Sequence, residues 1–380
     1  MLSVLVLGGY GFFGARIAKA LAADERLRLL VGGRDARKAA GAIRELGLPA
    51  EQGVQIDAHG GDLAARLRAL QVDVVVHTAG PFQGQDYAVA RAAIEAGCTY
   101  IDLADGRAFV AGIPSLDSLA RQNGVSVISG ASSVPALSSA VVDRYRPHFD
   151  QLQAIRVGIA SGARAPGLAT VHGIFGYLGK PFTRLEDGAW VTTHGWLDLH
   201  RQRFPQPLGG RWMGSCDVPD LAVFPALYPG LRTVTFHAGF ASDVGHLVVY
   251  ALAGLVRLGV LPSAAPFARP LNRLARMIEP LVSHRGGMFV TLEGTGRDRN
   301  ALSLTWNLLA AQNHGPQIPC GAAVALVRKL AGGEALPLGA MPCVGLLSVD
   351  EYLAPLADLD VREVRPGSGQ WDGPAPANVS

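Results

Sequence analysis

The sequence predicts an α/β protein in which a doubly wound parallel sheet is joined to a second, α+β domain. From residue 3 to about residue 129, short β-branched runs alternate with longer helical patterns rich in Ala and Arg. This is the order of a parallel sheet with helical crossovers. The runs are apolar on both faces, as at residues 72–78, which is typical of strands covered by helices above and below.

The first part has clear strand and helix patterns. Strands are expected at residues 3–7, 27–31, 54–57, 72–78, 100–103 and 125–129. Helical patterns between them occupy residues 13–23, 36–46 and 85–96.

The pattern is looser beyond residue 130. A helix is expected at residues 137–145 and longer strands at residues 152–161, 234–241, 288–294 and 301–310. The last two strands flank a turn at residues 296–299 and predict an antiparallel hairpin. Helices are expected at residues 320–331 and 349–356, and residues 362–380 lack the apolar content to fold alone, which predicts a flexible tail.

Composition argues against several classes of protein. Apolar residues make up 49% of the 380 residues and charged residues 17%, which suits a folded protein of about two domains. The net charge of +3 gives no basic footprint for nucleic acid. The four cysteines form no CxxC pair, so neither a metal site nor a disulfide framework is expected. Free thiols and the absence of a signal-peptide pattern predict a cytoplasmic protein.

One apolar stretch is long enough to be considered as a transmembrane helix. Residues 244–261 are apolar, but His246 and Arg257 interrupt them, so a transmembrane span is not expected. We expect a buried helix here, or one that makes weak peripheral contact with a membrane.

A glycine-rich turn follows the first expected strand and precedes the first helix. Gly9, Gly11 and Gly14 have the GxGxxG spacing, with Tyr10, Phe12 and Phe13 between them. The first glycine permits a tight turn, the second lets a pyrophosphate approach the backbone, and the third lets the helix pack close to the strand. The helix N-terminus then offers free N–H groups to phosphates. The sequence therefore predicts a dinucleotide-binding Rossmann domain.

The end of the second strand bears on the choice between NAD and NADP. An acidic residue there would bind a ribose hydroxyl and repel a phosphate. The chain instead has Gly33, which is expected to leave space, followed by Arg34, and Arg37 and Lys38 lie one turn beyond. This arrangement favours NADP and does not exclude NAD. Asp35 could be the N-cap of the following helix.

Two further strand ends belong to the expected cofactor site. Ala79, Gly80 and Pro81 close the fourth strand, where small residues would let the chain pass close to the ribose or the nicotinamide. Asp57 ends the third strand and is either beside the adenine or a turn-forming aspartate.

Hydride transfer also needs a group that moves a proton. Asp102 and Asp105 follow the fifth strand, whose carboxyl end faces the crevice in such sheets, and both are candidate catalytic residues. Capping or turn roles remain open for each. His77 lies within an apolar strand and is expected to be a core residue, whereas Arg164 could hold an anionic substrate.

Four segments resemble the saccharopine dehydrogenase (reductase) NADP-binding family. They are GGYGFFG at the N-terminus, GGRD after the second strand, HTAGPFQGQDYAVARAAIEAGCTYIDLADG, and SGASSVPALSSAVVD. GPQIPCGAAVALVRKLAGG and GAMPCVGLLSVDEYL are similar to the closing segments of such oxidoreductases.

The resemblance implies a domain division. Residues 1–130 would form the Rossmann domain, and helices at about 318–357 would pack back on it. Residues 131–317 would form an α+β domain for substrate binding and dimerisation. By the same resemblance Gly9, Gly11, Phe12, Phe13 and Gly14 match the phosphate turn, Arg34 the 2′-phosphate contact, and Ala79, Gly80 and Pro81 the nicotinamide-side loop.

The middle part departs from the family. No counterpart of the arginine cluster that would hold an amino-dicarboxylate is evident, and an apolar or mixed substrate is at least as plausible from its aromatic residues, Phe175, Phe182, Trp190, Trp196 and Trp212. The expected function is that of a homodimeric NADP-dependent oxidoreductase acting on a C=N, C=O or C=C bond of a small metabolite. The alternative is an NADP-binding sensor or interaction protein without catalysis.

Overall fold

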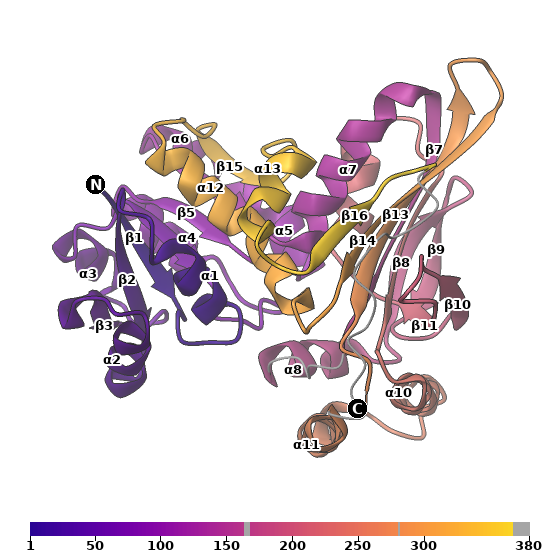
Figure 1. Ribbon diagram of the computed structural model, residues 1–380, viewed down its shortest axis with the longest axis horizontal. Coiled ribbons are helices and arrows are strands. Elements are labelled where there is room, and N and C mark those ends of the chain that lie inside the picture. The colour runs from indigo at the N-terminus through magenta and orange to yellow at the C-terminus, as the bar shows by residue number, and fades with distance from the viewer. Residues whose placement is uncertain (163–167, 280–281, 368–380) are drawn as a thin grey trace.

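The computed structural model describes residues 1–162, 168–279 and 282–367. These residues form two sheets with their helices (Figure 1). The first sheet has seven strands in the order β15-β6-β5-β4-β1-β2-β3, and all its pairs are parallel. The strands are β1 (Leu2–Leu7), β2 (Leu27–Gly33), β3 (Gly53–Gln55), β4 (Val74–His77), β5 (Thr99–Asp102), β6 (Ser126–Ser129) and β15 (Gly339–Pro342). The predicted doubly wound sheet is confirmed.

Helices cover both faces of this sheet. Val4 and Val6 of β1 belong to a core that includes Ile17 of α1, whereas Leu5 and Leu7 belong to a core on the opposite face that includes Leu67 of α3. Burial on both faces explains the continuous apolar runs in the sequence. The helices are α1 (Gly14–Leu21), α2 (Ala36–Glu45), α3 (Leu63–Ala69), α4 (Ala88–Glu95), α5 (Arg107–Gly112) and α6 (Asp117–Gln122).

The second sheet is mixed and has nine strands. Its path is β10-β11-β12-β7-β13-β14-β16, with β8 paired to β12 and β9 paired to β8. The predicted hairpin is present, because β13 and β14 pair antiparallel. Gly286 is opposite Ala310 at one end of the pairing, and Thr295 is opposite Ala301 at the other. The strands are β7 (Phe149–Ala160), β8 (Pro181–Glu186), β9 (Ala189–His194), β10 (His200–Arg203), β11 (Gly210–Ser215), β12 (Thr233–Gly239), β13 (Gly286–Gly296), β14 (Ala301–Ala310) and β16 (Val361–Val364).

The second part of the chain also contains helices. They are α7 (Ser138–Tyr145), α8 (Leu168–Tyr177), α9 (Asp220–Leu227), α10 (Asp243–Arg257) and α11 (Ala268–Ile278). Figure 1 places α10 and α11 at the end of the sheet that lies away from the tip of the β13–β14 hairpin. Among the described residues, no helix is both long and apolar enough to cross a bilayer.

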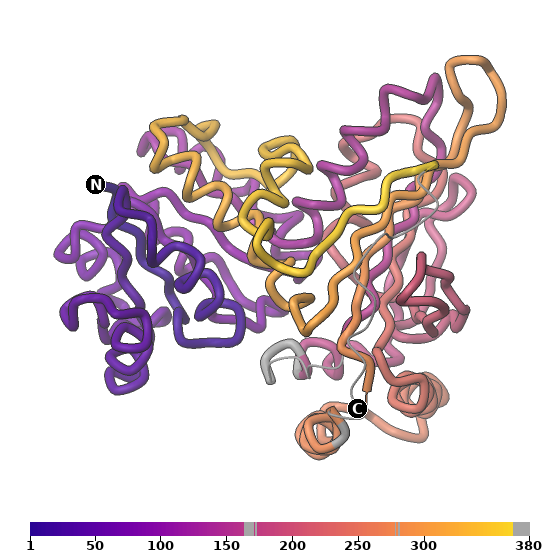
Figure 2. The backbone as a smooth tube through the Cα atoms, viewed as in Figure 1, coloured from indigo at the N-terminus to yellow at the C-terminus, as the bar shows by residue number. Residues whose placement is uncertain are grey.

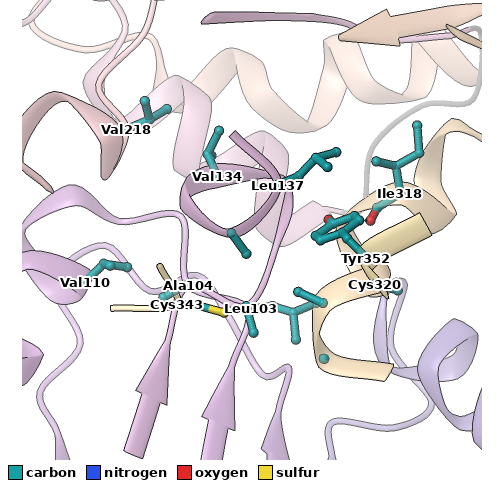
Figure 3. Packing of buried hydrophobic residues seen from close by; sticks show 14 of the residues in the cluster. Leu103, Ala104, Val110, Val134, Leu137, Val218, Ile318, Cys320, Cys343 and Tyr352 are labelled. Atoms are coloured by element: carbon teal, nitrogen blue, oxygen red, sulfur yellow. The ribbon is translucent and has the colours of Figure 1, made fainter. Parts of the chain in front are cut away.

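The C-terminal segment contacts both sheets. The helix α12 (Gly321–Ala331) packs against α1 and β1, and β15 pairs with β6. In the helix α13 (Val349–Leu353), the Tyr352 hydroxyl donates to the Ile318 carbonyl at 2.7 Å. Figure 3 shows Ile318 and Tyr352 in one apolar cluster with Leu103 from the region after β5, so the two ends of the chain share a core.

In the second sheet the strands β8, β9, β10 and β11 were not predicted, and two elements of the C-terminal segment also differ from the expectations drawn from the sequence. β15 was not predicted, because its sequence, Gly-Ala-Met-Pro, has no β-branched residue. The flexible tail expected from residue 362 was wrong at its start, because residues 361–364 form β16 and pair with β14 (Figure 2). Residues 368–380 of that expected tail lie outside the described residues.

Side-chain contacts explain why β16 is fixed. The Glu363 carboxylate accepts from Trp306 Nε1 at 2.5 Å and from Arg144 Nη1 at 3.0 Å, and only 13% of the Glu363 side chain is exposed. Trp306 is fully buried. Glu363 therefore satisfies a buried indole N–H and links β16 to both β14 and α7.

We predict that Glu363→Ala lowers the free energy of unfolding by about 1–3 kcal/mol, because it leaves a buried donor without its acceptor. Urea denaturation measures this change. Glu334→Ala is the matched control, since Glu334 pairs with Lys329 at the surface and its loss should cost about 0.5 kcal/mol or less. Equal losses in the two variants would contradict the account of β16.

Candidate active site

The glycine-rich turn packs tightly against the end of β4. A Cβ on Gly14 would lie 2.3 Å from the Gly8 carbonyl oxygen and 2.6 Å from Thr78 Oγ1, so this position could not hold a side chain. A Cβ on Gly9 would lie 2.8 Å from the Val6 carbonyl oxygen. Gly8 itself has φ of 83°, a left-handed conformation that favours glycine. The turn therefore has the close helix-to-strand packing that the spacing predicts.

The same turn leaves the start of α1 without a side-chain cap. Gly11 has no side chain to cover the backbone, and a Cβ there would lie 2.9 Å from the Gly8 carbonyl oxygen. The N-cap residue Phe13 makes no side-chain hydrogen bond to the helix, so it does not cap this N-terminus. An uncapped helix start behind a glycine turn suits a pyrophosphate, and the residues present fit the dinucleotide that the sequence predicts.

The region above Gly33 is filled by protein. A Cβ on Gly33 would lie 2.5 Å from the Tyr10 hydroxyl oxygen, so the tyrosine ring covers the glycine that was expected to leave space. The Tyr10 hydroxyl accepts from the Asp35 backbone N–H at 3.1 Å. Arg34 is exposed beside this ring, which leaves its guanidinium accessible.

Two aspartates at these strand ends have local backbone partners. Asp35 is the N-cap of α2 and accepts from the N–H groups of Arg37 at 3.0 Å and Lys38 at 3.1 Å, which confirms the capping alternative. Asp57 accepts from the His59 N–H at 3.1 Å and is exposed. The structure thus shows its turn role, while a contact with adenine stays a prediction.

A cavity of about 350 Å³ lies between the two sheets. The N-terminal side of its wall contains Phe12 and Phe13 from the glycine turn and Gly80 and Pro81 from the end of β4. Ala79 is not among the lining residues. The second part of the chain supplies mainly apolar side chains, including Ile159, Ile174, Val218, Phe236 and Met288.

A pair of stacked rings forms part of the apolar wall. The Trp196 and Phe240 rings lie 4.7 Å apart between centroids with an interplanar angle of 7°. His246 packs behind both rings, is fully buried, and does not line the cavity; burial lowers its pKa to about 4. Of the five aromatic residues singled out in the sequence, Trp196 lines the cavity and Phe175, Phe182, Trp190 and Trp212 do not.

Charged groups are sparse on this wall. The lining residues within the described ranges include no lysine or arginine; the charged or titratable ones are Asp105, Tyr177, Cys216 and His284. Arg164, the expected partner of an anionic substrate, lies outside the described residues. Burial raises the pKa of Cys216 to about 12, so this thiol stays protonated near neutral pH.

The two candidate catalytic aspartates have different positions. Asp102 is fully buried and does not line the cavity. Its Oδ1 accepts from the N–H groups of Gly130 at 2.8 Å and Ala104 at 2.9 Å and from Ser129 Oγ at 3.0 Å. Burial raises the pKa of Asp102 to about 6, and these hydrogen bonds oppose the rise. Its contacts hold the chain segments after β5 and β6 together, which is a structural role.

Asp105 lies on the cavity wall and its side chain is accessible. Its Oδ1 accepts from Gln83 Nε2 at 3.1 Å. Partial desolvation by the surrounding cavity wall raises the pKa of this carboxyl above its ordinary value of 3.8. A carboxyl with a raised pKa in a cleft is suited to move a proton.

Two histidines also differ in position, one in the core and one on the cavity wall. His77 is buried, its Nδ1 lies 2.9 Å from the Tyr100 hydroxyl, and burial lowers its pKa to about 3, so it is the core residue that the sequence predicts. His284 lines the cavity, with its Nδ1 2.8 Å from Asn313 Nδ2. Neither His284 nor Asn313 was predicted from the sequence, because neither belongs to a motif and they meet only through the β13–β14 hairpin.

The glycine turn at the carboxyl edge of a parallel sheet, with a cavity leading to a second sheet, defines a two-part dinucleotide-binding protein. Residues 4–128 match the family model described as the saccharopine dehydrogenase NADP binding domain. The match lies in the N-terminal domain of this chain. A search of curated proteins found no match.

A solved structure shows the same fold at low sequence identity. Saccharopine dehydrogenase (L-Glu forming) from Saccharomyces cerevisiae is 14% identical with a TM-score of 0.64, and the match covers 96% of this chain and 100% of that one. Amine dehydrogenase from Mycobacterium smegmatis is 13% identical with a TM-score of 0.49, covering 92% and 95%. The family match supports an NADP-binding N-terminal domain, and the likeness to the yeast enzyme shows the fold alone.

We predict that Gly14→Ala weakens cofactor binding and lowers the free energy of unfolding by about 1–3 kcal/mol, because its Cβ would overlap the backbone. Gly41→Ala is the control: Gly41 lies within α2, a Cβ there would meet no atom within 4 Å, and the change should stabilise by about 0.5–1 kcal/mol. Thermal unfolding and titration with NADP measure both effects. Unchanged stability and binding in Gly14→Ala would contradict the packing described for the turn.

Proposed function

We propose that this protein is an NADP-dependent oxidoreductase that transfers a hydride between the nicotinamide and a C=N, C=O or C=C bond of a small, largely apolar metabolite. The observation that carries the proposal is that the phosphate turn and the cavity have residues in common. Phe12 and Phe13 belong to the phosphate turn and also line the cavity, beside Gly80 and Pro81. A dinucleotide held at the turn would therefore have its reactive end next to the cavity.

Different residues would bind the different parts of the cofactor and the substrate. Gly11 and the uncapped start of α1 would receive the pyrophosphate, and Arg34 the 2′-phosphate. When bound, the cofactor supplies or accepts the hydride. The stacked Trp196 and Phe240 rings, with Phe236 and Met288, exclude water from the space where an apolar substrate would lie.

Asp105 is the residue placed to move the proton. Reduction of a C=O or C=N bond adds a hydride to carbon and a proton to the heteroatom, and a protonated Asp105 can give that proton from the cavity wall. The reverse reaction needs the ionised carboxylate as base. This side chain favours the enzyme over the alternative of a sensor without catalysis, since a sensor needs no accessible carboxyl at this position.

Location and assembly are part of the proposal. All four cysteines are free and buried, as suits a reducing compartment such as the cytoplasm. A homodimer formed through the second part of the chain also remains a proposal.

We predict that Arg34→Ala weakens NADP binding by about tenfold or more, because a charge-assisted hydrogen bond to phosphate is lost, and leaves NAD binding unchanged. Isothermal titration with each cofactor measures this. Arg44→Ala is the matched control, since Arg44 is exposed near the other end of α2. Equal weakening of NADP and NAD binding would rule out Arg34 as the phosphate contact.

We predict that Asp105→Asn lowers kcat by about 100-fold or more with little change in NADP affinity. In the oxidative direction, wild-type kcat should fall as pH drops through the raised pKa of Asp105, because the base becomes protonated. In the reductive direction kcat should fall as pH rises through it. The variant should lack this limb of the pH profile, and an unchanged profile would exclude Asp105 as the proton-moving group.

A further inference from the structure

Large apolar side chains are exposed at one end of the second sheet. Within the described residues, nine of the thirteen exposed large hydrophobic side chains fall between residues 244 and 277. We call this set the α10–α11 face; it comprises Val244, Leu247, Val248, Leu255, Leu258, Val260, Phe267, Leu274 and Met277. Such a concentration is unusual for a surface that faces only water.

The exposed residues of α10 follow a helical stripe. Val244, Val248, Leu255 and Leu258 recur at spacings of three, four or seven residues, so they lie on one side of the helix. The opposite side is buried and includes His246, which packs against the Trp196 and Phe240 rings. The helix therefore has one side in the protein core and an equally apolar side in solvent. Val244 is 71% exposed and Leu258 77%.

The helix α11 has an apolar stripe beside a basic one. Phe267, Leu274 and Met277 are exposed, and Met277 is 77% exposed. Arg273 and Arg276 immediately precede Leu274 and Met277 in the sequence. Arg269 lies one turn before Arg273, so the three exposed arginines share one side of the helix. An apolar side flanked by arginines is the pattern of a helix that lies in a membrane interface.

The charge of the segment is one-sided. Residues 244–278 contain four arginines and no aspartate or glutamate; with Asp243 and Glu279, which flank this segment, the net charge is +2. Arg257, Arg269, Arg273 and Arg276 are all exposed. Anionic lipid headgroups complement this charge. A second copy of the chain does not, because a two-fold interface would bring two such arginine sets together.

We propose that the α10–α11 face docks on the surface of an anionic lipid bilayer. The apolar side chains enter the boundary between headgroups and acyl chains, and the arginines contact lipid phosphates. The site is distinct from the cofactor turn, and the docking does not depend on the proposed function.

The helices of the α10–α11 face pack against elements that line the cavity or support its wall. Ile174 and Tyr177 of α8 line the cavity, and α8 packs against α11. His246 of α10 contacts the cavity's ring pair from behind. A docked membrane would therefore lie one layer of helices away from an apolar cavity.

Flotation of the full-length protein with vesicles tests the proposal. We expect binding to vesicles of phosphatidylcholine with phosphatidylglycerol and much weaker binding to phosphatidylcholine alone. Each arginine near an anionic surface strengthens binding about fivefold, so Arg269→Gln/Arg273→Gln/Arg276→Gln should bind roughly a hundredfold more weakly. The control Arg44→Gln/Arg91→Gln/Arg299→Gln changes the same charge at exposed arginines elsewhere and should bind like wild type.

A second pair of variants tests the apolar contribution. Leu258→Ser/Met277→Ser should weaken binding by about tenfold or more, whereas Leu227→Ser/Leu338→Ser, at exposed sites outside the face, should not. Thermal unfolding confirms that each variant is folded. Absence of wild-type binding to anionic vesicles, or equal losses in the test and control pairs, would overturn the proposal. A wild-type dimer that does not float and that Leu258→Ser/Met277→Ser converts to a monomer would instead identify the face as a subunit interface.

Discussion

The close contact between the glycine turn and the end of β4 is the constraint on which the rest of the site depends. Gly14 lies against the Gly8 carbonyl and Thr78 Oγ1, and Thr78 Oγ1 in turn donates to the Leu7 carbonyl at 3.0 Å. This contact fixes the start of α1 beside the loop that carries Gly80 and Pro81. The anion-binding position and the cavity wall are therefore set by one piece of packing.

The C-terminal segment fixes the opposite wall relative to that turn. Ile318 lines the cavity, and its carbonyl accepts from the buried Tyr352 hydroxyl. Beyond it, β15 extends the first sheet and β16 extends the second. Because one segment belongs to both sheets, the aromatic wall and the cofactor turn are held by a shared core rather than by a flexible linker (Figure 3).

Much of the first sheet could be predicted from the sequence, because strands buried on both faces leave long apolar runs. The glycine turn was predictable for a similar reason, since each glycine has a steric task that local spacing records. β15 and β16 were not predictable in this way, because short strands depend on neighbours that are distant in sequence. β15 pairs with β6, more than 200 residues away, and β16 depends on Glu363 meeting Trp306 and Arg144.

The site itself was only partly predictable. The sequence places Asp102 and Asp105 at the same strand end, but it does not show that backbone N–H groups occupy Asp102 while Asp105 stays accessible in the cavity. Likewise, the Tyr10 ring covers Gly33 through a contact that spacing does not reveal. Lining residues such as His284 and Trp196 are brought to the cavity by the second sheet, whose sequence carries no motif.

The most direct test of the account is a comparison of substrates in an assay that follows NADPH absorbance. The panel should pair apolar carbonyl, imine and alkene compounds with analogues that carry a carboxylate at the position away from the reacting bond. We expect NADPH oxidation with members of the apolar set and a loss of turnover when the carboxylate is added. Turnover confined to the carboxylated compounds would contradict the assignment of the apolar cavity as the substrate site.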